Sequence, residues 1–203
     1  MGRSAGGLAA LELSRLPPLG DWEAFYIIVG SSAGALTGLM FVVVALGAQA
    51  KALGDPRQLH AFATPTLVHF GAVLLVAAIL SIPGHTVKSL GLCLLICGLG
   101  GLSYAAWVIA MALLQKGYEP DFFDWLWYAV FPIAAYASLL IASAMLRQNP
   151  AAALSTVAAS SLLLLYVGIH NSWDSATWIA THRQRTAKEG PPSAALEADP
   201  PEE

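Results

Sequence analysis

One short stretch of the chain, Tyr166-Val-Gly-Ile-His-Asn-Ser-Trp-Asp174, concentrates side chains that can do chemistry. Tyr166, His170 and Asp174 recur every four residues, so a helix would place all three on one face. An imidazole next to a carboxylate can exchange protons near neutral pH, and it can also supply ligands to a metal ion. Asn171 within this stretch and Thr177 three residues after it add hydrogen-bonding groups. We therefore take these residues as a candidate polar cluster.

The residues before this cluster are almost free of charge, and the same pattern recurs along the chain. Of the 203 residues, 57% are apolar and only 11% are charged, whereas a soluble domain carries about 25% charged residues. Mean hydropathy is +0.63. Five long windows contain no Asp, Glu, Lys or Arg and together cover more than half of the chain: residues 24–46, 62–82, 89–114, 125–145 and 151–169.

These windows predict the fold class. A helix needs about 20 mainly apolar residues to cross the hydrocarbon core of a bilayer, and backbone groups in lipid must be paired internally. The runs are continuously apolar and do not alternate as the strands of a membrane barrel would. We expect an all-α integral membrane protein, a bundle of five transmembrane helices. The last helix should continue past its apolar window to about residue 180, toward a basic cluster.

Proline, glycine and asparagine mark the expected helix ends. Asp55-Pro56 is typical of a helix start, which would put Pro65 inside the second helix; alternatively, Thr64 caps a new helix there. Pro83-Gly84 should end that helix, and Asn149-Pro150 should begin the fifth. Pro132 lies inside the fourth window and should kink the helix, freeing a backbone carbonyl near Tyr128.

The sequence outside the helices is short. Residues 1–20 hold Leu8, Leu11 and Leu16 at a spacing compatible with a helix lying on the membrane surface. Residues 21–188 form the expected transmembrane domain. Residues 189–203 are acidic and rich in proline, and should be disordered.

Lysine and arginine predict the orientation of the termini. With the N-terminus outside, the inner segments hold six basic residues and the outer segments four, so the positive-inside rule favours N-outside and C-cytoplasmic. Richness in Ala, Gly and Pro and the compact architecture favour a bacterial inner (plasma) membrane. The inner residues are Lys51, Arg57, Lys116, Arg183, Arg185 and Lys188; the outer ones are Arg3, Arg15, Lys88 and Arg147.

Two stripes of small residues should pack helices together. Gly30, Gly34 and Gly38 follow one another every four residues in the first helix, a spacing that lets a neighbouring helix approach closely. We expect packing inside the monomer, with self-association as the alternative. Cys93, Cys97 and Gly101 form a similar stripe in the third helix, and the cysteines are interpreted as inert packing residues.

His69 is the other ionisable residue at membrane depth. In the expected topology it lies at a depth comparable to that of His170, so His69, His170 and Asp174 would be able to meet. Ionisable groups in a span usually face the bundle interior. Three interpretations stay open: helix packing through hydrogen bonds, including bonds from Asn171 and Thr177 to neighbouring helices; a proton, ion or solute path; and a metal site of His69, His170 and Asp174.

The sequence argues against several functional classes. The net charge of −3 shows no basic excess for nucleic acid. Nucleotide-binding loops, HExxH and a nucleophile elbow are absent, so we expect no enzymatic activity. No cofactor is predicted, although a metal ion or a haem between His69 and His170 stays an alternative. We expect an ion, proton or small-solute pathway or a sensing element, with an accessory or scaffold subunit and a redox subunit as alternatives. The expected partners are the lipid bilayer and a second copy or another membrane protein.

Overall fold

The structure is a computed structural model that describes residues 19–49, 56–114 and 122–189. Within these ranges every long element is a helix and no strand occurs. The elements in chain order are η1 (Leu19–Trp22), α2 (Glu23–Gln49), α3 (Pro56–Ser81), α4 (Val87–Leu114), α5 (Phe122–Trp125), η2 (Leu126–Val130), α6 (Phe131–Met145) and α7 (Pro150–Glu189). The surface helix predicted at Leu8, Leu11 and Leu16 and the disorder predicted for 189–203 lie outside the described residues, apart from Glu189 itself.

Five helical segments are long and apolar enough to cross a membrane, as the charge-free windows predict. Their bounds are Leu19–Ala45, Thr64–Ser81, Val87–Leu114, Phe122–Met145 and Pro150–Thr177. The fourth segment is built from α5, η2 and α6 in succession. The chain is thus all-helical over its described residues and compatible with a multi-pass membrane protein.

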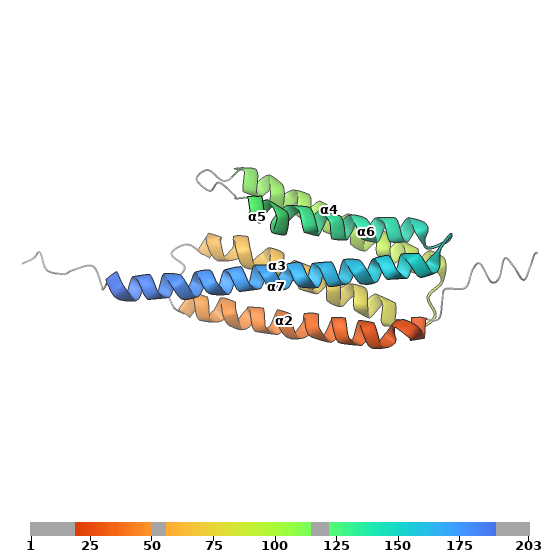
Figure 1. The fold of residues 1–203 in the computed structure, drawn as a ribbon, viewed down its shortest axis with the longest axis horizontal. Helices are drawn as coiled ribbons and strands as arrows, with labels where there is room; N and C mark the ends of the chain where they lie inside the picture. Colours follow the sequence, from red (N-terminus) through yellow and green to blue (C-terminus); the bar gives the residue numbers. More distant parts are fainter. Residues whose placement is uncertain (1–18, 50–55, 115–121, 190–203) are drawn as a thin grey trace, which may run out of the picture.

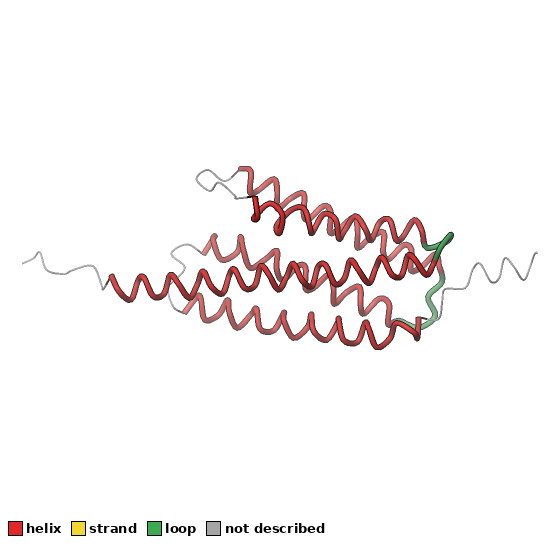
Figure 2. Tube along the Cα trace, in the orientation of Figure 1, coloured by secondary structure: helices red, strands yellow, loops and turns green. Residues whose placement is uncertain are grey.

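The helices lie roughly side by side and alternate in direction (Figure 1). α7 lies next to α3 and α6; α2 packs on α3, and α4 packs on α6. The short loops that join α3 to α4 and α6 to α7 lie at the same end of the bundle (Figure 2). Consequently α2 begins and α7 ends at opposite ends of the molecule.

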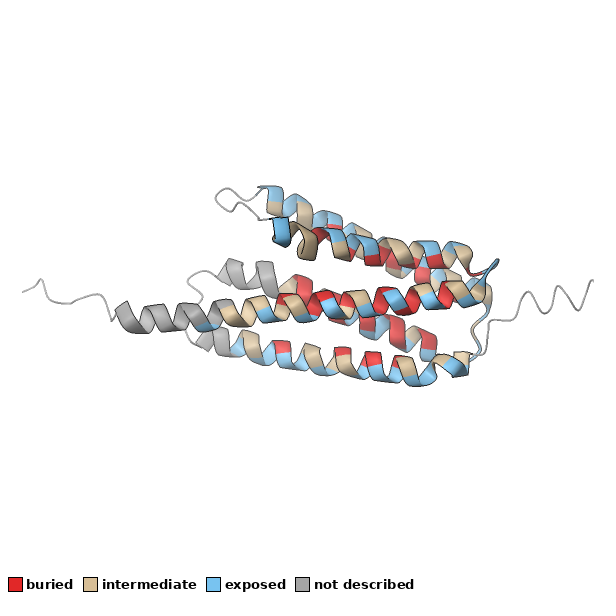
Figure 3. Cartoon of the chain, viewed as in Figure 1, coloured by how far each residue is buried: buried red, intermediate tan, exposed pale blue. Residues whose placement is uncertain are grey.

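Burial follows the inner faces of the helices (Figure 3). The core joins Val73 and Val76 of α3 with Leu94, Leu139 and Leu154 from the other helices. The outward faces are apolar as well. Exposed side chains include Ile28, Phe41, Trp107 and Ile141. Soluble monomers rarely expose apolar surface of this extent.

The helix ends match the local signals of the sequence. α3 begins at Pro56 and contains Pro65, which confirms the first of the two starts considered above. Gly84 has a φ of +80°, a conformation that glycine adopts without a steric penalty, and it follows the end of α3. At the start of α7, the Ala152 N–H donates to Asn149 Oδ1 over 3.1 Å, so Asn149 caps this helix.

The expected disturbance at Pro132 takes the form of a π-helical turn, η2, immediately before α6. The Phe131 N–H donates to the Leu126 carbonyl, five residues earlier. Proline has no N–H to donate within the helix, so the chain shifts from α-helical to wider π-helical pairing over the preceding turn. This segment positions Trp127.

Candidate functional site

A histidine and a tyrosine meet inside the bundle. His69 of α3 is 3% exposed and Tyr136 of α6 is 1% exposed. The His69 Nδ1 atom lies 3.0 Å from the Tyr136 hydroxyl oxygen, and the ring centroids are 5.8 Å apart. Either group can be the donor: the hydroxyl donates to an unprotonated Nδ1, and an Nδ1–H donates to the hydroxyl oxygen. The pair therefore links two helices by a bond through which a proton can be exchanged.

Two glycines of α4 leave the space that Tyr136 of α6 occupies. A Cβ atom added at Gly101 would overlap Cγ, Cδ1 and Cε1 of the Tyr136 ring. A Cβ at Gly98 would lie 3.1 Å from the Tyr136 carbonyl oxygen and 2.9 Å from Leu140 Cγ. The absence of side chains at these two positions lets α4 and α6 approach closely. Gly101, predicted as a packing residue, thus orients the hydroxyl that His69 contacts.

Serine hydroxyls tie the same helices together. Ser160 Oγ of α7 donates to the Ala135 carbonyl of α6 over 2.7 Å, one residue before Tyr136. Ser143 Oγ of α6 donates to the Gly91 carbonyl of α4 over 2.7 Å. Interhelical bonds of this kind contribute about 0.6–2 kcal/mol each in a membrane. They fix α6 between α4 and α7.

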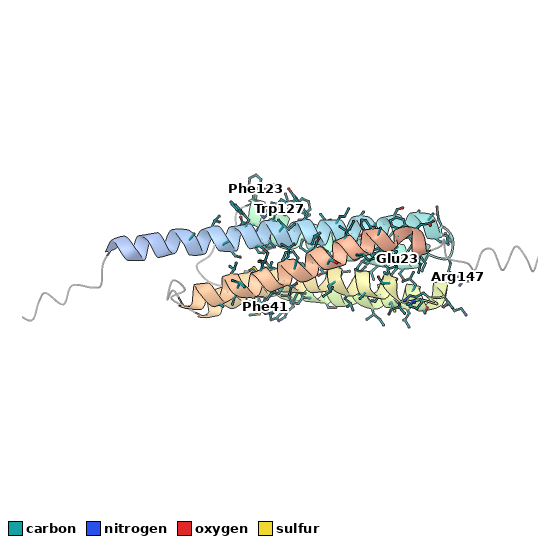
Figure 4. The ribbon with its side chains drawn as sticks, turned by 90° about the horizontal axis from the view of Figure 1, so that it is seen from below. Glu23, Phe41, Phe123, Trp127 and Arg147 are labelled. Carbon is teal, nitrogen blue, oxygen red and sulfur yellow. The ribbon has the colours of Figure 1, made fainter. Side chains whose placement is uncertain are left out.

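A second polar group gathers around Trp127 of η2. The His170 ring stacks on the Trp127 ring, with centroids 3.8 Å apart and planes 5° from parallel. Tyr166 and Phe131 lie beside the same indole, at centroid distances of 5.5 and 4.9 Å. Figure 4 shows Trp127 and Phe123 in the half of the bundle away from Glu23 and Arg147. The stack therefore lies away from the end that carries these two charged residues.

Asp174 completes this group. Its Oδ2 atom lies 3.2 Å from His170 Nδ1, and the two side chains are 46% and 33% exposed. The separation is that of an ion pair, but the atoms lack hydrogen-bond alignment, since Nδ1 has no hydrogen-bond partner by geometry. The predicted i, i+4 pairing of His170 and Asp174 is present, and both side chains are only partly buried.

Asn171 lacks the expected interhelical bond, and the two hydrogen bonds described for Thr177 lie within its own helix. Asn171 is 0% exposed, yet neither Oδ1 nor Nδ2 has a hydrogen-bond partner. Thr177 Oγ1 donates to the carbonyls of Trp173 and Asp174 in its own helix, both at 3.0 Å. Asn171 therefore makes no bond to another helix. A helical wheel gives the face of a residue, but it does not give the neighbour that this face meets.

The predicted small-residue stripes pack only in part. A Cβ at Gly30 would lie 2.9 Å from Ala77 Cβ of α3, so Gly30 is a close contact inside the monomer, as expected. Among the described residues, nothing lies within 4 Å of a Cβ added at Gly34 or Gly38. Cys93 and Cys97 are free and partly buried. Self-association through the open glycines stays a prediction.

His69 and His170 lie at a similar level along the bundle but have different partners. Phe70, next to His69, occupies the space beside Gly168, where a Cβ would lie 2.8 Å from Phe70 Cδ1. His69 nevertheless pairs with Tyr136, and His170 stacks on Trp127. Over the described part of the chain, no three His, Cys, Asp or Glu side chains form a group of metal-site type, so His69 does not join His170 and Asp174. The metal and haem alternatives stay predictions.

No known protein family, curated protein or solved structure matches this chain. Two participants, Tyr136 and Trp127, are missing from the sequence-based cluster. Tyr136 has one recognisable signal, a hydroxyl in the middle of a charge-free window. Trp127 has another, its place one turn before the helix-breaking Pro132.

Proposed function

We propose that the five helices cross a membrane and that the protein conducts or senses protons through two polar groups inside the bundle. The observation that carries this proposal is the hydrogen bond between His69 and Tyr136, formed between side chains that are almost completely enclosed. Ionisable residues in a membrane span are costly and are therefore functional candidates by default. Histidine is the side chain whose ordinary titration range is nearest to physiological pH.

The chemistry of the pair suits proton transfer in either direction. A proton delivered to Nε2 of an imidazole that carries its proton on Nδ1 allows Nδ1 to pass its own proton to an acceptor. Tyrosine can accept a hydrogen bond at its oxygen and donate its own proton onward. The two side chains thus form a relay element of two groups that belong to different helices.

The His170–Asp174 group would serve the same path closer to the end of the bundle. Both side chains are partly exposed, and Asp174 is the first charged residue after the charge-free window 151–169. In the proposed path this group collects protons near the membrane surface, and the His69–Tyr136 pair carries them at depth.

A second candidate function is that of an accessory or scaffold subunit. The bonds from Ser160 to Ala135 and from Ser143 to Gly91 favour it, because they show polar side chains used only to join helices. If the protein is a scaffold subunit, the hydrogen bond between His69 and Tyr136 also serves only to join two helices. Measured flux separates the two candidates.

The test is proton flux into liposomes that contain the purified full-length protein and a pH-sensitive dye, driven by a potassium diffusion potential. Tyr136→Phe keeps the ring beside Gly101 and removes only the hydroxyl that contacts His69. We expect this variant to lose about tenfold or more of the protein-dependent flux, since a positioned proton-transfer group contributes at least this much to proton-transfer rates. His170→Ala and Asp174→Asn should lower the flux as well.

Tyr26→Phe is the matched control. Tyr26 is also buried, and its hydroxyl has no hydrogen-bond partner, so this variant makes the same chemical change away from the pair. It should keep the flux of the natural sequence. Flux equal to that of empty liposomes for the natural sequence would remove the pathway and favour the scaffold. An equal loss of proton flux in Tyr136→Phe and Tyr26→Phe would show that the flux does not depend on the hydrogen bond between His69 and Tyr136.

A further inference from the structure

Tyr104 of α4 turns its polar end toward the inside of the bundle. The residue as a whole is only partly buried, and its ring lies beside the exposed Trp107, with the ring centroids 5.9 Å apart. Its hydroxyl oxygen, by contrast, is buried. A tyrosine near a protein surface usually buries its ring and leaves its hydroxyl at the outside. Tyr104 has the opposite arrangement, so its hydroxyl faces the bundle interior.

The part of the interior next to Tyr104 is the pair of His69 and Tyr136. The Tyr136 ring of α6 fills the space at Gly101, where an added Cβ would overlap three of its ring atoms. Tyr104 lies one helical turn from Gly101, on the same face of α4. The side chains of Tyr104 and Tyr136 are also close enough to interact electrostatically. Tyr104 thus brings a hydroxyl from a third helix to the pair that joins α3 and α6.

Proton transfer within this pair creates charge in an apolar interior. When the hydroxyl proton of Tyr136 moves to Nδ1 of His69, the O–H bond breaks and an N–H bond forms, so the two side chains become a phenolate and an imidazolium. A charge buried in such surroundings is costly unless it is hydrogen-bonded. A hydroxyl next to the oxygen that gains the negative charge supplies the donor that lowers this cost.

We propose that Tyr104 assists proton transfer between Tyr136 and His69 by donating a hydrogen bond to the Tyr136 oxygen. The two tyrosine hydroxyls are not hydrogen-bonded in this structure, and bonds of this kind often form fully only as a reaction proceeds. The partly exposed ring of Tyr104 has room for the adjustment, unlike the enclosed ring of Tyr136. The inference rests on the proposed function, because a passive bundle needs no donor at this position.

The first experiment measures proton flux and stability of Tyr104→Phe beside those of the natural sequence, with the full chain in liposomes. The substitution removes a hydroxyl that makes no hydrogen bond in this structure, so the thermal midpoint should move by less than about 2 °C. The flux should nevertheless fall about tenfold, since a positioned group of a proton-transfer step contributes at least this much. A structural role of Tyr104 would lower midpoint and flux together, and that outcome would contradict the proposal.

Cys97→Ala is the matched control for this measurement. Cys97 lies one turn from Gly101 in the other direction along α4 and also interacts electrostatically with Tyr136, but its thiol is only a weak donor. This variant should keep the natural flux. Unchanged flux in Tyr104→Phe, or an equal loss in Cys97→Ala, would overturn the inference and leave the relay of His69 and Tyr136 in place. Absence of flux in the natural sequence would instead remove the proposed function, and the inference with it.

The second experiment tests the arrangement of the side chains without flux. The chain has six tyrosines, which can be labelled with ¹³C at Cζ and observed by solid-state NMR in lipid bilayers. We expect a through-space correlation between Tyr104 and Tyr136 that disappears in Tyr104→Phe and in Tyr136→Phe. A spectrum without this correlation would show that the two hydroxyls are not neighbours, and the assistance by Tyr104 would then be ruled out.

Discussion

Gly101→Ala should destabilise the bundle by about 2–3 kcal/mol, in the range observed for overpacked cores. The added methyl group would overlap the root of the Tyr136 ring, and this ring is 1% exposed and has no room to turn aside. Relief requires α4 and α6 to separate, which also opens the contact that Ser143 makes with Gly91. The measurement is the free energy of unfolding in mixed micelles, from the loss of helical circular dichroism.

The neighbouring residue provides the control for this prediction. Gly100 has nothing within 4 Å of an added Cβ. Gly100→Ala should therefore leave stability unchanged or raise it slightly, because alanine favours a helix over glycine by up to about 1 kcal/mol. Adjacent glycines of one helix are expected to respond with opposite signs. Equal responses would show that α4 does not approach α6 through Gly101.

Gly168→Ala should cost about 1–3 kcal/mol for the same reason in a different interface. The added methyl group would lie 2.8 Å from Cδ1 and 2.9 Å from Cζ of the fully buried Phe70 ring. This contact sets the distance between α3 and α7, on which both His69 and Asn171 depend. Unfolding of the variant in the same micelles measures the effect.

Gly71→Ala is the matched control for the α3–α7 interface. Gly71 follows Phe70 directly, is exposed, and has no atom within 4 Å of an added Cβ. It should be neutral or slightly stabilising. If Gly168→Ala left stability unaltered, the ring of Phe70 would have to lie elsewhere, and α3 and α7 would not be in close contact at Gly168.

Much of the fold could be predicted from the sequence because long apolar windows without charge restrict it strongly. Long windows without charge in an apolar chain allow few structures other than helices, and the number and approximate bounds of the five segments follow. Local sequence signals also predicted where helices begin and where they are disturbed. Asn149 caps α7, and a π-helical turn precedes Pro132, where a kink is expected. These features depend only on residues close in sequence.

The partners of the polar residues could not be predicted in the same way. A helical period gives the face of His69, and the topology gives its depth, but neither gives the rotation of α3 against its neighbours. That rotation depends on close contacts such as Tyr136 at Gly101 and Phe70 at Gly168, which join residues far apart in the chain. His69 consequently meets Tyr136, although the sequence suggested His170.

The glycine stripe of α2 illustrates the same limit. Gly30, Gly34 and Gly38 have identical spacing, yet among the described residues only Gly30 would bring an added Cβ against a neighbouring helix, at Ala77. α2 and α3 are inclined to each other (Figures 1 and 4), so they are closest over a limited length. A regular pattern of small residues thus indicates a surface suited to close approach, without showing how far along the helix a neighbour follows it.

The most direct test of this account is the ¹⁵N NMR spectrum of the histidine side chains in lipid bilayers. The chain has five histidines, and a His69→Asn variant identifies the resonances of His69. Tyr136→Phe should move the Nδ1 resonance of His69 and leave the others in place, whereas Tyr26→Phe should move none of them. An unchanged His69 resonance in Tyr136→Phe would show that the two side chains do not meet, and it would remove the basis of the proposed proton path.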